Sequence, residues 1–148
     1  MKKGRRRFDQ VFEMQAQLCK VLALKADIGI RLRNAYQNKE KDNLTDICNN
    51  VIPELIKRLD GFYEAFKRQW MLENKSFGFE VQTIRIGGLK QRLLDIESYL
   101  KDYLNGEQTI EELETKAFPV GYALYGASND EPEYNRYQKL VTTSRLTW

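Results

Sequence analysis

Histidine is absent from this 148-residue chain, and cysteine and proline are scarce, with two and three residues. Without histidine the chain lacks the most common general base, the most common metal ligand and the usual proton switch near neutral pH. Hydrolysis by a serine or cysteine triad is therefore excluded, and so is a zinc site of the usual composition. We expect no metal and no cofactor.

Long apolar runs are also missing, and none approaches the roughly 20 residues that a membrane-spanning helix needs. The basic start MKKGRRRF is followed by FDQVFEMQAQ, which has neither the apolar core nor the cleavage site of a secretory signal. The two cysteines, Cys19 and Cys48, lie within helical patterns and are interpreted as reduced core thiols. These observations predict a cytoplasmic protein with no membrane partner.

Positive charge is concentrated at the amino terminus. The formal net charge is +3, but residues 1–7 carry five positive charges, which leaves 3 minus 5, or −2, for the remainder. A nucleic-acid-binding domain needs a basic face that is part of the fold. Residues 1–8 are therefore interpreted as a basic tail or linker, and no nucleic-acid partner is expected. A nucleic-acid-binding adaptor that uses this arm is one alternative.

Three long stretches have the apolar spacing of amphipathic helices, with residues that recur at intervals of three and four. They run from about Asp9 to Asn38, from Asp42 to Trp70 and from Val81 to Leu104. Short turns join them, so neighbouring helices are expected to be antiparallel. Within the second stretch, Pro53 predicts a kink or a new first turn, because proline removes a donor and clashes with the preceding turn.

Glycine occurs both inside these helical patterns and at their ends. Asn105-Gly106 is typical of a helix carboxyl terminus, and Gly78 is expected to occupy a turn with positive φ. Gly29 in the first helix and Gly87-Gly88 in the third each lower helix stability by about 1 kcal/mol relative to alanine. We therefore interpret them as places where another helix or backbone comes close.

The composition changes after the third helix. Residues 109–112 form a capping box, which predicts a short fourth helix that ends near Lys116. Residues 118–148 contain two short runs of β-type residues without a helical period, which favours a β-hairpin or an irregular cover on the bundle. The predicted fold is mainly α: an antiparallel three-helix bundle, a short fourth helix and a short β or irregular tail. Residues 9–117 form the bundle, and the whole chain is one domain.

The segment between the second and third helices has the densest aromatic pattern. Phe77 and Phe79 flank Gly78, and Glu80 and Arg85 follow them. An acidic residue and an arginine among aromatics are typical of a partly buried structural or interface pair, with direct ligand contact as the alternative. The predicted contact face consists of Trp70, Phe77, Phe79, Glu80, Arg85, Gly87 and Gly88. Trp70 is equally compatible with ordinary core packing.

Four runs of the sequence resemble one known family: ADIGIRLRNAYQ (26–37), PELIKRLDGFYEAFKRQW (53–70), ENKSFGFEVQTIRIGGLKQRL (73–93) and IEELE (110–114). They are similar to the helical C-terminal domain of bacterial β-N-acetylhexosaminidases in glycoside hydrolase family 20, especially the streptococcal exo-β-N-acetylglucosaminidase type. The closing run YNRYQKLVTTSRL (134–146) is similar to the last segment of that family. The most specific part of the resemblance is NKxFGFEVxxxRxGGL.

The resemblance implies an origin in an enzyme that removes terminal N-acetylglucosamine. Such enzymes use the acetamido group of the substrate as nucleophile, together with an Asp-Glu pair on a (β/α)8 barrel. A barrel needs roughly 250 residues, so this chain does not contain one, and no catalytic residue is assigned. The resemblance therefore implies a non-catalytic accessory domain that packs on the barrel of its parent enzyme. A homodimer is also expected, because an exposed aromatic patch favours self-association.

A stand-alone helical enzyme of the chorismate-mutase type is the other alternative. Such an enzyme would use arginines and a glutamate inside a helical bundle. The residues of that kind here are Arg31, Arg33, Arg85 and Glu80. An activity assay separates this hypothesis from that of a docking domain.

Overall fold

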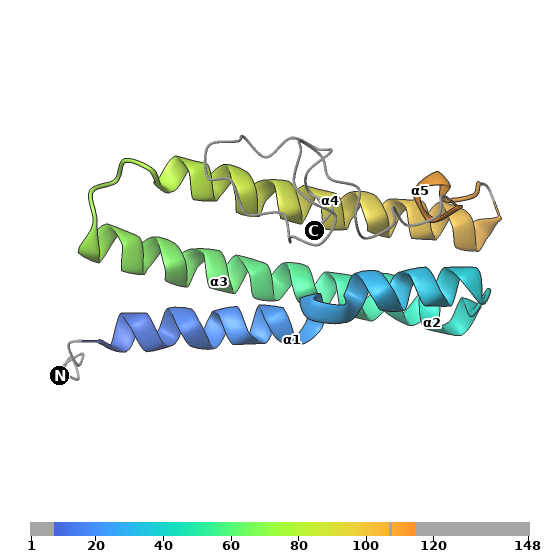
Figure 1. Ribbon diagram of the computed structural model, residues 1–148, viewed down its shortest axis with the longest axis horizontal. Coiled ribbons are helices and arrows are strands. Elements are labelled where there is room, and N and C mark those ends of the chain that lie inside the picture. The colour runs from blue at the N-terminus through green and yellow to red at the C-terminus, as the bar shows by residue number, and fades with distance from the viewer. Residues whose placement is uncertain (1–7, 107, 115–148) are drawn as a thin grey trace, which may run out of the picture.

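The computed structural model describes residues 8–106 and 108–114 of the chain. Its three long helices are α1 (Asp9–Gln37), α3 (Ile52–Glu73) and α4 (Phe79–Asn105). Each runs antiparallel to the long helix before it, and α3 lies between α1 and α4 (Figure 1). The short elements are α2 (Lys41–Asp46), the π-helix η1 (Ile47–Val51) and α5 (Glu111–Glu114). The predicted mainly α bundle with a short fourth helix is confirmed.

Two glycines with positive φ set the limits of α4. Gly78 precedes the helix with φ of 92°, and Gly106 follows it with φ of 81°. Glycine adopts this left-handed region at little cost, whereas other residues are strained there. The N–H of Gly106 donates to the carbonyl oxygen of Tyr103 at 3.0 Å, which satisfies one free carbonyl of the last turn. The predicted turn at Gly78 and the predicted stop at Asn105-Gly106 are both confirmed.

Pro53 does not interrupt the rod formed by α2, η1 and α3. These elements follow one another without a loop, and Pro53 lies in the first turn of α3. In the π-helical turn before it, the N–H of Ile52 donates to the carbonyl oxygen of Ile47, five residues earlier. A proline ring clashes with the carbonyl group four residues before it in a regular α-helix, and the wider turn relieves this clash. The predicted disturbance is thus a local widening of the helix.

The hydrophobic core is concentrated at the end of the bundle where α2, η1 and α5 lie. The fully buried large side chains are Leu44, Ile47, Cys48, Ile52, Leu55 and Leu100. Near the opposite end, where α3 turns into α4, the buried side chains of the described residues are Ala65 and Phe79. The bundle therefore has a closed end with a continuous core and an open end with little core of its own.

Tyr36 fastens α5 to the closed end. Its hydroxyl donates to Glu114 Oε1 at 2.5 Å and accepts the N–H of Ile110 at 3.2 Å. Arg92 on α4 pairs with Glu112 and so connects the same short helix to a second element. Burial, together with the bond to the Glu114 carboxylate, raises the pKa of Tyr36 above its ordinary value of 10.0. The phenol is therefore held in its neutral form.

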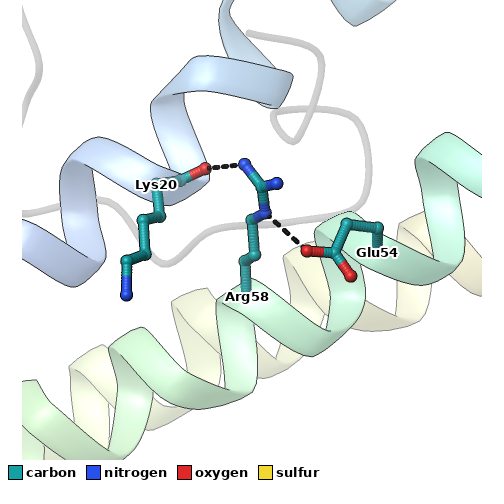
Figure 2. A network of polar contacts seen from close by, with 3 residues as sticks. All are labelled: Lys20, Glu54 and Arg58. Atoms are coloured by element: carbon teal, nitrogen blue, oxygen red, sulfur yellow. Dashed lines mark hydrogen bonds and ion pairs between the residues drawn. The ribbon is translucent and has the colours of Figure 1, made fainter.

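Arg58 joins α3 to the middle of α1 (Figure 2). Its Nε donates to Glu54 Oε1 at 2.8 Å, and its Nη1 donates to the backbone carbonyl oxygen of Lys20 at 2.9 Å. The hydrogen bond from Arg58 holds the pKa of the Glu54 carboxyl below its ordinary value. Arg68–Glu13 joins α3 to α1 and Lys90–Asp60 joins α4 to α3, each as an ion pair at 2.8 Å. Exposed pairs of this kind contribute little to stability, so they orient the helices more than they hold them together.

Two sequence predictions about α1 are wrong. Cys19 is exposed, whereas Cys48 is buried as predicted, and burial raises the pKa of the Cys48 thiol. Cys19 lies two residues before the buried Val21, and two residues correspond to roughly 200° around a helix, so the two side chains point to opposite sides. Gly29 is also open: a Cβ there would meet nothing within 4 Å, so the close contact expected with another helix is not found among the described helices.

Several predictions concern residues outside the described part of the chain. They are the basic tail before Phe8, the end of the fourth helix after Glu114, and the hairpin or cover at 118–148. The division into 1–8, 9–117 and 118–148, and the nucleic-acid alternative that depends on the basic arm, therefore stay predictions. None of the described helices is both long enough and apolar enough to cross a membrane.

Truncation of Leu100 tests the position of the core. Leu100 is fully buried, so Leu100→Ala is expected to lower the free energy of unfolding by about 2–5 kcal/mol. Leu94→Ala on the same helix is the control, because its side chain is 40% exposed and its loss is expected to cost less than about 1 kcal/mol. Urea denaturation followed by circular dichroism measures both. Equal losses would contradict a core at the closed end.

The raised pKa of Tyr36 predicts that the free energy of unfolding falls at alkaline pH. Its pKa is higher in the folded chain, so the neutral phenol contributes fully below the unfolded pKa of about 10, and this contribution is lost as pH rises through the folded pKa. The difference in unfolding free energy between wild type and Tyr36→Phe is expected to be constant below about pH 9 and to shrink above about pH 10. Denaturation at each pH measures it, and a difference that does not change with pH would argue against the bond to Glu114.

Candidate functional site at the turn between α3 and α4

Four aromatic side chains pack together where α3 ends and α4 begins. Phe66 and Trp70 lie one turn apart on α3, with ring centres 6.0 Å apart. Phe79, the first residue of α4, lies 5.6 Å from the ring of Phe66 and 5.7 Å from that of Trp70. Tyr63 completes this aromatic cluster at 5.7 Å from Phe79. Only 4% of Phe79 is exposed, so it is the main buried side chain of the open end.

The turn before α4 is bonded to this aromatic cluster. Trp70 Nε1–H donates to the carbonyl oxygen of Lys75 at 2.9 Å, which ties the indole ring to the turn. Gly78 lies against the same ring, because a Cβ there would be 3.5 Å from Trp70 Cζ2. The N–H of Gly78 donates to Glu80 Oε2 at 2.7 Å, so an acidic side chain satisfies a backbone donor at the start of α4. Residues 74–78 are thereby held in one conformation.

Glu80 and Arg85 do not form the pair expected from the sequence. Glu80 is exposed and is bonded to Gly78, while Arg85 is half-buried and has no hydrogen bond or ion pair with another described residue. Five residues along a helix correspond to roughly 140° around its axis, so the two side chains point to different sides of α4. The prediction of an intramolecular pair is wrong for this reason.

One side of α4 is apolar and exposed. Phe77, just before the helix, is 82% exposed, and Val81 and Ile84 are 39% and 53% exposed. Gly87 follows on the next turn, where a Cβ would meet nothing within 4 Å. Leu94 is 40% exposed but lies roughly 140° around the helix from Val81, so it is not part of this side. Phe77, Val81, Ile84 and Gly87 are named the α4 face.

The sequence also matches a known protein family. The sequence profile of the Glycoside Hydrolase 20C C-terminal domain matches residues 1–129, which include every described helix. The chain belongs to this family. No curated protein matches it. The resemblance to the C-terminal domain of glycoside hydrolase family 20 is confirmed, while the similarity of residues 134–146 lies beyond the match and the streptococcal type stays a prediction.

The fold of this glycoside hydrolase 20C C-terminal domain divides the predicted contact residues into two groups. Trp70 and Phe79 belong to the aromatic cluster, where Phe79 is buried and Trp70 is half-buried. The remaining five lie on the turn or on α4: Phe77, Glu80 and Gly87 are exposed, and Arg85 and Gly88 are half-buried. Their contact with a partner stays a prediction, and the sequence analysis did not assign Val81 and Ile84 to it. The sequence alone does not show that these two apolar side chains are exposed, because that depends on which side of α4 faces α3.

The residues of the alternative helical enzyme do not converge in this domain. Arg31 and Arg33 lie near the carboxyl end of α1, whereas Glu80 and Arg85 lie near the amino end of α4. α1 and α4 run in the same direction, so these are opposite ends of the bundle (Figure 1). Within the described ranges, no three acidic or cysteine side chains are grouped so that they could hold a metal ion. The geometry gives no support to an active site built from these four residues.

Replacing Gly78 or Gly87 with alanine is expected to change the stability of the domain in opposite directions. Gly78→Ala is expected to destabilise the chain by about 1–2 kcal/mol, because φ of 92° is strained for alanine. Gly87→Ala is expected to stabilise it by up to about 1 kcal/mol, because alanine favours the helix and has open space there. Urea denaturation of the two variants compares them directly. A loss at Gly87 as large as that at Gly78 would mean that the chain itself already covers the α4 face.

Proposed function

We propose that this domain is a non-catalytic accessory part of a bacterial β-N-acetylhexosaminidase and that its α4 face packs on the catalytic (β/α)8 barrel of the parent enzyme. The family match over residues 1–129 supports the origin in a family 20 enzyme. The exposed apolar α4 face is the observation that carries the docking role. The parent enzyme would act on terminal N-acetylglucosamine, and the two free cysteines, Cys19 and Cys48, favour the reducing cytoplasm as its location.

The α4 face has the composition of a contact surface. Phe77 and Ile84 expose most of their side chains, and neighbouring exposed apolar residues are typical of places where proteins bind one another. Gly87 leaves one end of the face without a side chain at a cost of about 1 kcal/mol in helix stability, which a helix exposed only to water would not need. A partner backbone could approach closely there. The barrel of the parent enzyme carries helices on its outer surface, and packed helices lie roughly 8–10 Å apart, with small residues at the contact allowing the closer distances.

Polar and aromatic groups beside the α4 face fit the same role. Arg85 is half-buried and has no partner among the described residues, so a carboxylate or a carbonyl oxygen of the barrel would satisfy its guanidinium. The aromatic cluster acts indirectly, since the bond from Trp70 to Lys75 fixes the turn that presents Phe77. In this proposal Trp70 and Phe79 support the contact surface and Phe77 touches the partner.

The same proposal leaves bond cleavage to the barrel. A catalytic barrel needs roughly 250 residues, which is more than this chain has. The one Asp-Glu dipeptide of the sequence, Asp130-Glu131, lies just beyond the matched residues and outside the described part of the chain. No catalytic role is therefore proposed for any residue of this domain.

The full-length parent enzyme tests the docking role. Ile84→Glu places a charge on the α4 face and is expected to lower the melting temperature and the soluble yield of the enzyme, because the charge would have to be buried at the contact. The kcat of the folded fraction is expected to stay near the wild-type value, since Ile84 lies outside the barrel. Differential scanning calorimetry and a chromogenic N-acetylglucosaminide assay measure the two quantities.

The matched control is Leu72→Glu, which makes the same kind of change at a leucine of α3 that is 62% exposed and lies outside the α4 face. It is expected to leave the melting temperature within a degree or so of wild type, as most exposed substitutions change stability by less than about 0.5 kcal/mol. Equal behaviour of the two variants would contradict docking through the α4 face. Hydrolysis of the chromogenic substrate by the 148-residue chain alone would contradict the non-catalytic role.

A further inference from the structure

α1 has a second apolar side, which faces away from the bundle. Six residues recur at alternating intervals of four and three: Phe12, Ala16, Cys19, Ala23, Ala26 and Ile30. All six are exposed, and the two largest, Phe12 and Ile30, are 68% and 67% exposed. These six residues are named the α1 seam. The core residue Val21 lies on the opposite side of the helix.

The spacing of the α1 seam is that of a coiled coil. Alternating steps of four and three keep side chains on one side of a helix, here over about 27 Å. The outer side of a helix in a soluble protein normally carries charged and polar residues. None of the six positions is charged, and Leu22 at the edge adds an apolar side chain that is 47% exposed. α1 is therefore apolar on two opposite sides, which is the pattern of a helix with partners on both.

We propose that the α1 seam is a dimer contact that packs against the α1 seam of a second copy of this chain. The bulky Phe12 and Ile30 lie at its two ends, and the four positions between them hold alanine or cysteine. Two identical helices placed side by side therefore bring small residues opposite small residues along the middle, where their backbones approach closely. Such a contact would bury on the order of 1,000 Å² from the two copies together, which is near the lower limit for a biological interface and typical of a weak, concentration-dependent dimer.

The position of α1 makes this contact independent of the proposed docking on the barrel. α1 and α4 lie on opposite sides of α3, so a dimer formed through the α1 seam leaves the α4 face free (Figure 1). The homodimer expected from the sequence is thereby assigned to a surface that the sequence analysis did not single out. Gly29, which is open within the chain, lies at the edge of the α1 seam, where a second helix would come close.

Charges at the edges of the α1 seam favour a parallel pair. In an antiparallel pair Lys20 would lie beside Lys20 of the second copy, so like charges would meet. In a parallel pair Lys20 lies near Gln15 of the second copy, and no like charges are adjacent. Each seam residue then faces its own counterpart, so the two Cys19 side chains are neighbours.

Sedimentation of the purified 148-residue chain tests the contact. Ala23→Glu places a charge in the α1 seam, and it is expected to raise the dimer dissociation constant at least tenfold without unfolding the chain, since Ala23 is exposed and glutamate favours helices. Ile84→Glu is the matched variant on the α4 face and is expected to remain dimeric. A dimer that persists in Ala23→Glu but is lost in Ile84→Glu would overturn the proposal, as would a wild-type monomer at every concentration.

Disulfide trapping under an added oxidant gives the direction of the pair. In a parallel dimer the native Cys19 side chains are expected to form a covalent dimer, and Cys19→Ser but not Cys48→Ser removes it, because Cys48 is buried. In an antiparallel dimer Cys19 faces Ala23 of the second copy, so Ala23→Cys is needed for trapping. The control for random collisions is Leu72→Cys in a Cys19→Ser background. No trapping of either kind above this control would overturn the contact.

Discussion

The fold depends on one constraint: among the described helices, α3 alone has another long helix on both sides. Where α2, η1 and α5 add further elements, a continuous core forms around Leu44, Ile52 and Leu100, and Tyr36 bonds the last short helix to it. Where these elements are absent, α1 and α4 each pack on α3 along one side. Their other sides carry the α1 seam and the α4 face, so the apolar surface of this domain follows directly from the order of its helices.

The open end is stabilised by aromatic packing in place of aliphatic core. Phe79 inserts between side chains of α3, and Trp70 bonds to the backbone of the turn, which leaves Gly78 against the indole ring with φ of 92°. Aromatic rings have a large apolar area and a fixed shape. Four of them can therefore fix the conformation of the turn at residues 74–78, although few other residues pack against it. An accessory domain that docks through this end gains a surface whose position is fixed before the partner binds.

Much of the fold could be predicted from sequence because the signals involved are local. The helix limits depend on apolar spacing and on glycines with positive φ, and both act over a few residues, as α4 and its flanking Gly78 and Gly106 illustrate. The candidate site was predicted less well. The sequence gives Phe77 and Phe79 the same character, yet one is 82% and the other 4% exposed, because only Phe79 turns toward α3. Glu80 likewise accepts a hydrogen bond from the backbone N–H of Gly78, and the sequence pattern does not identify this partner.

The sequence by itself determined the helices, the turns between them and the family, since spacing, turn chemistry and the run NKSFGFEVQTIRIGGL are properties of neighbouring residues. Tertiary structure alone decided which side of each helix is buried. Cys19 and Cys48 have similar helical surroundings in the sequence, but Cys48 packs in the core and Cys19 lies on the outer side of α1. α1 and α4 are apolar on more than one side, so periodicity cannot say which side meets α3, and that choice is made by the packing of all three helices together.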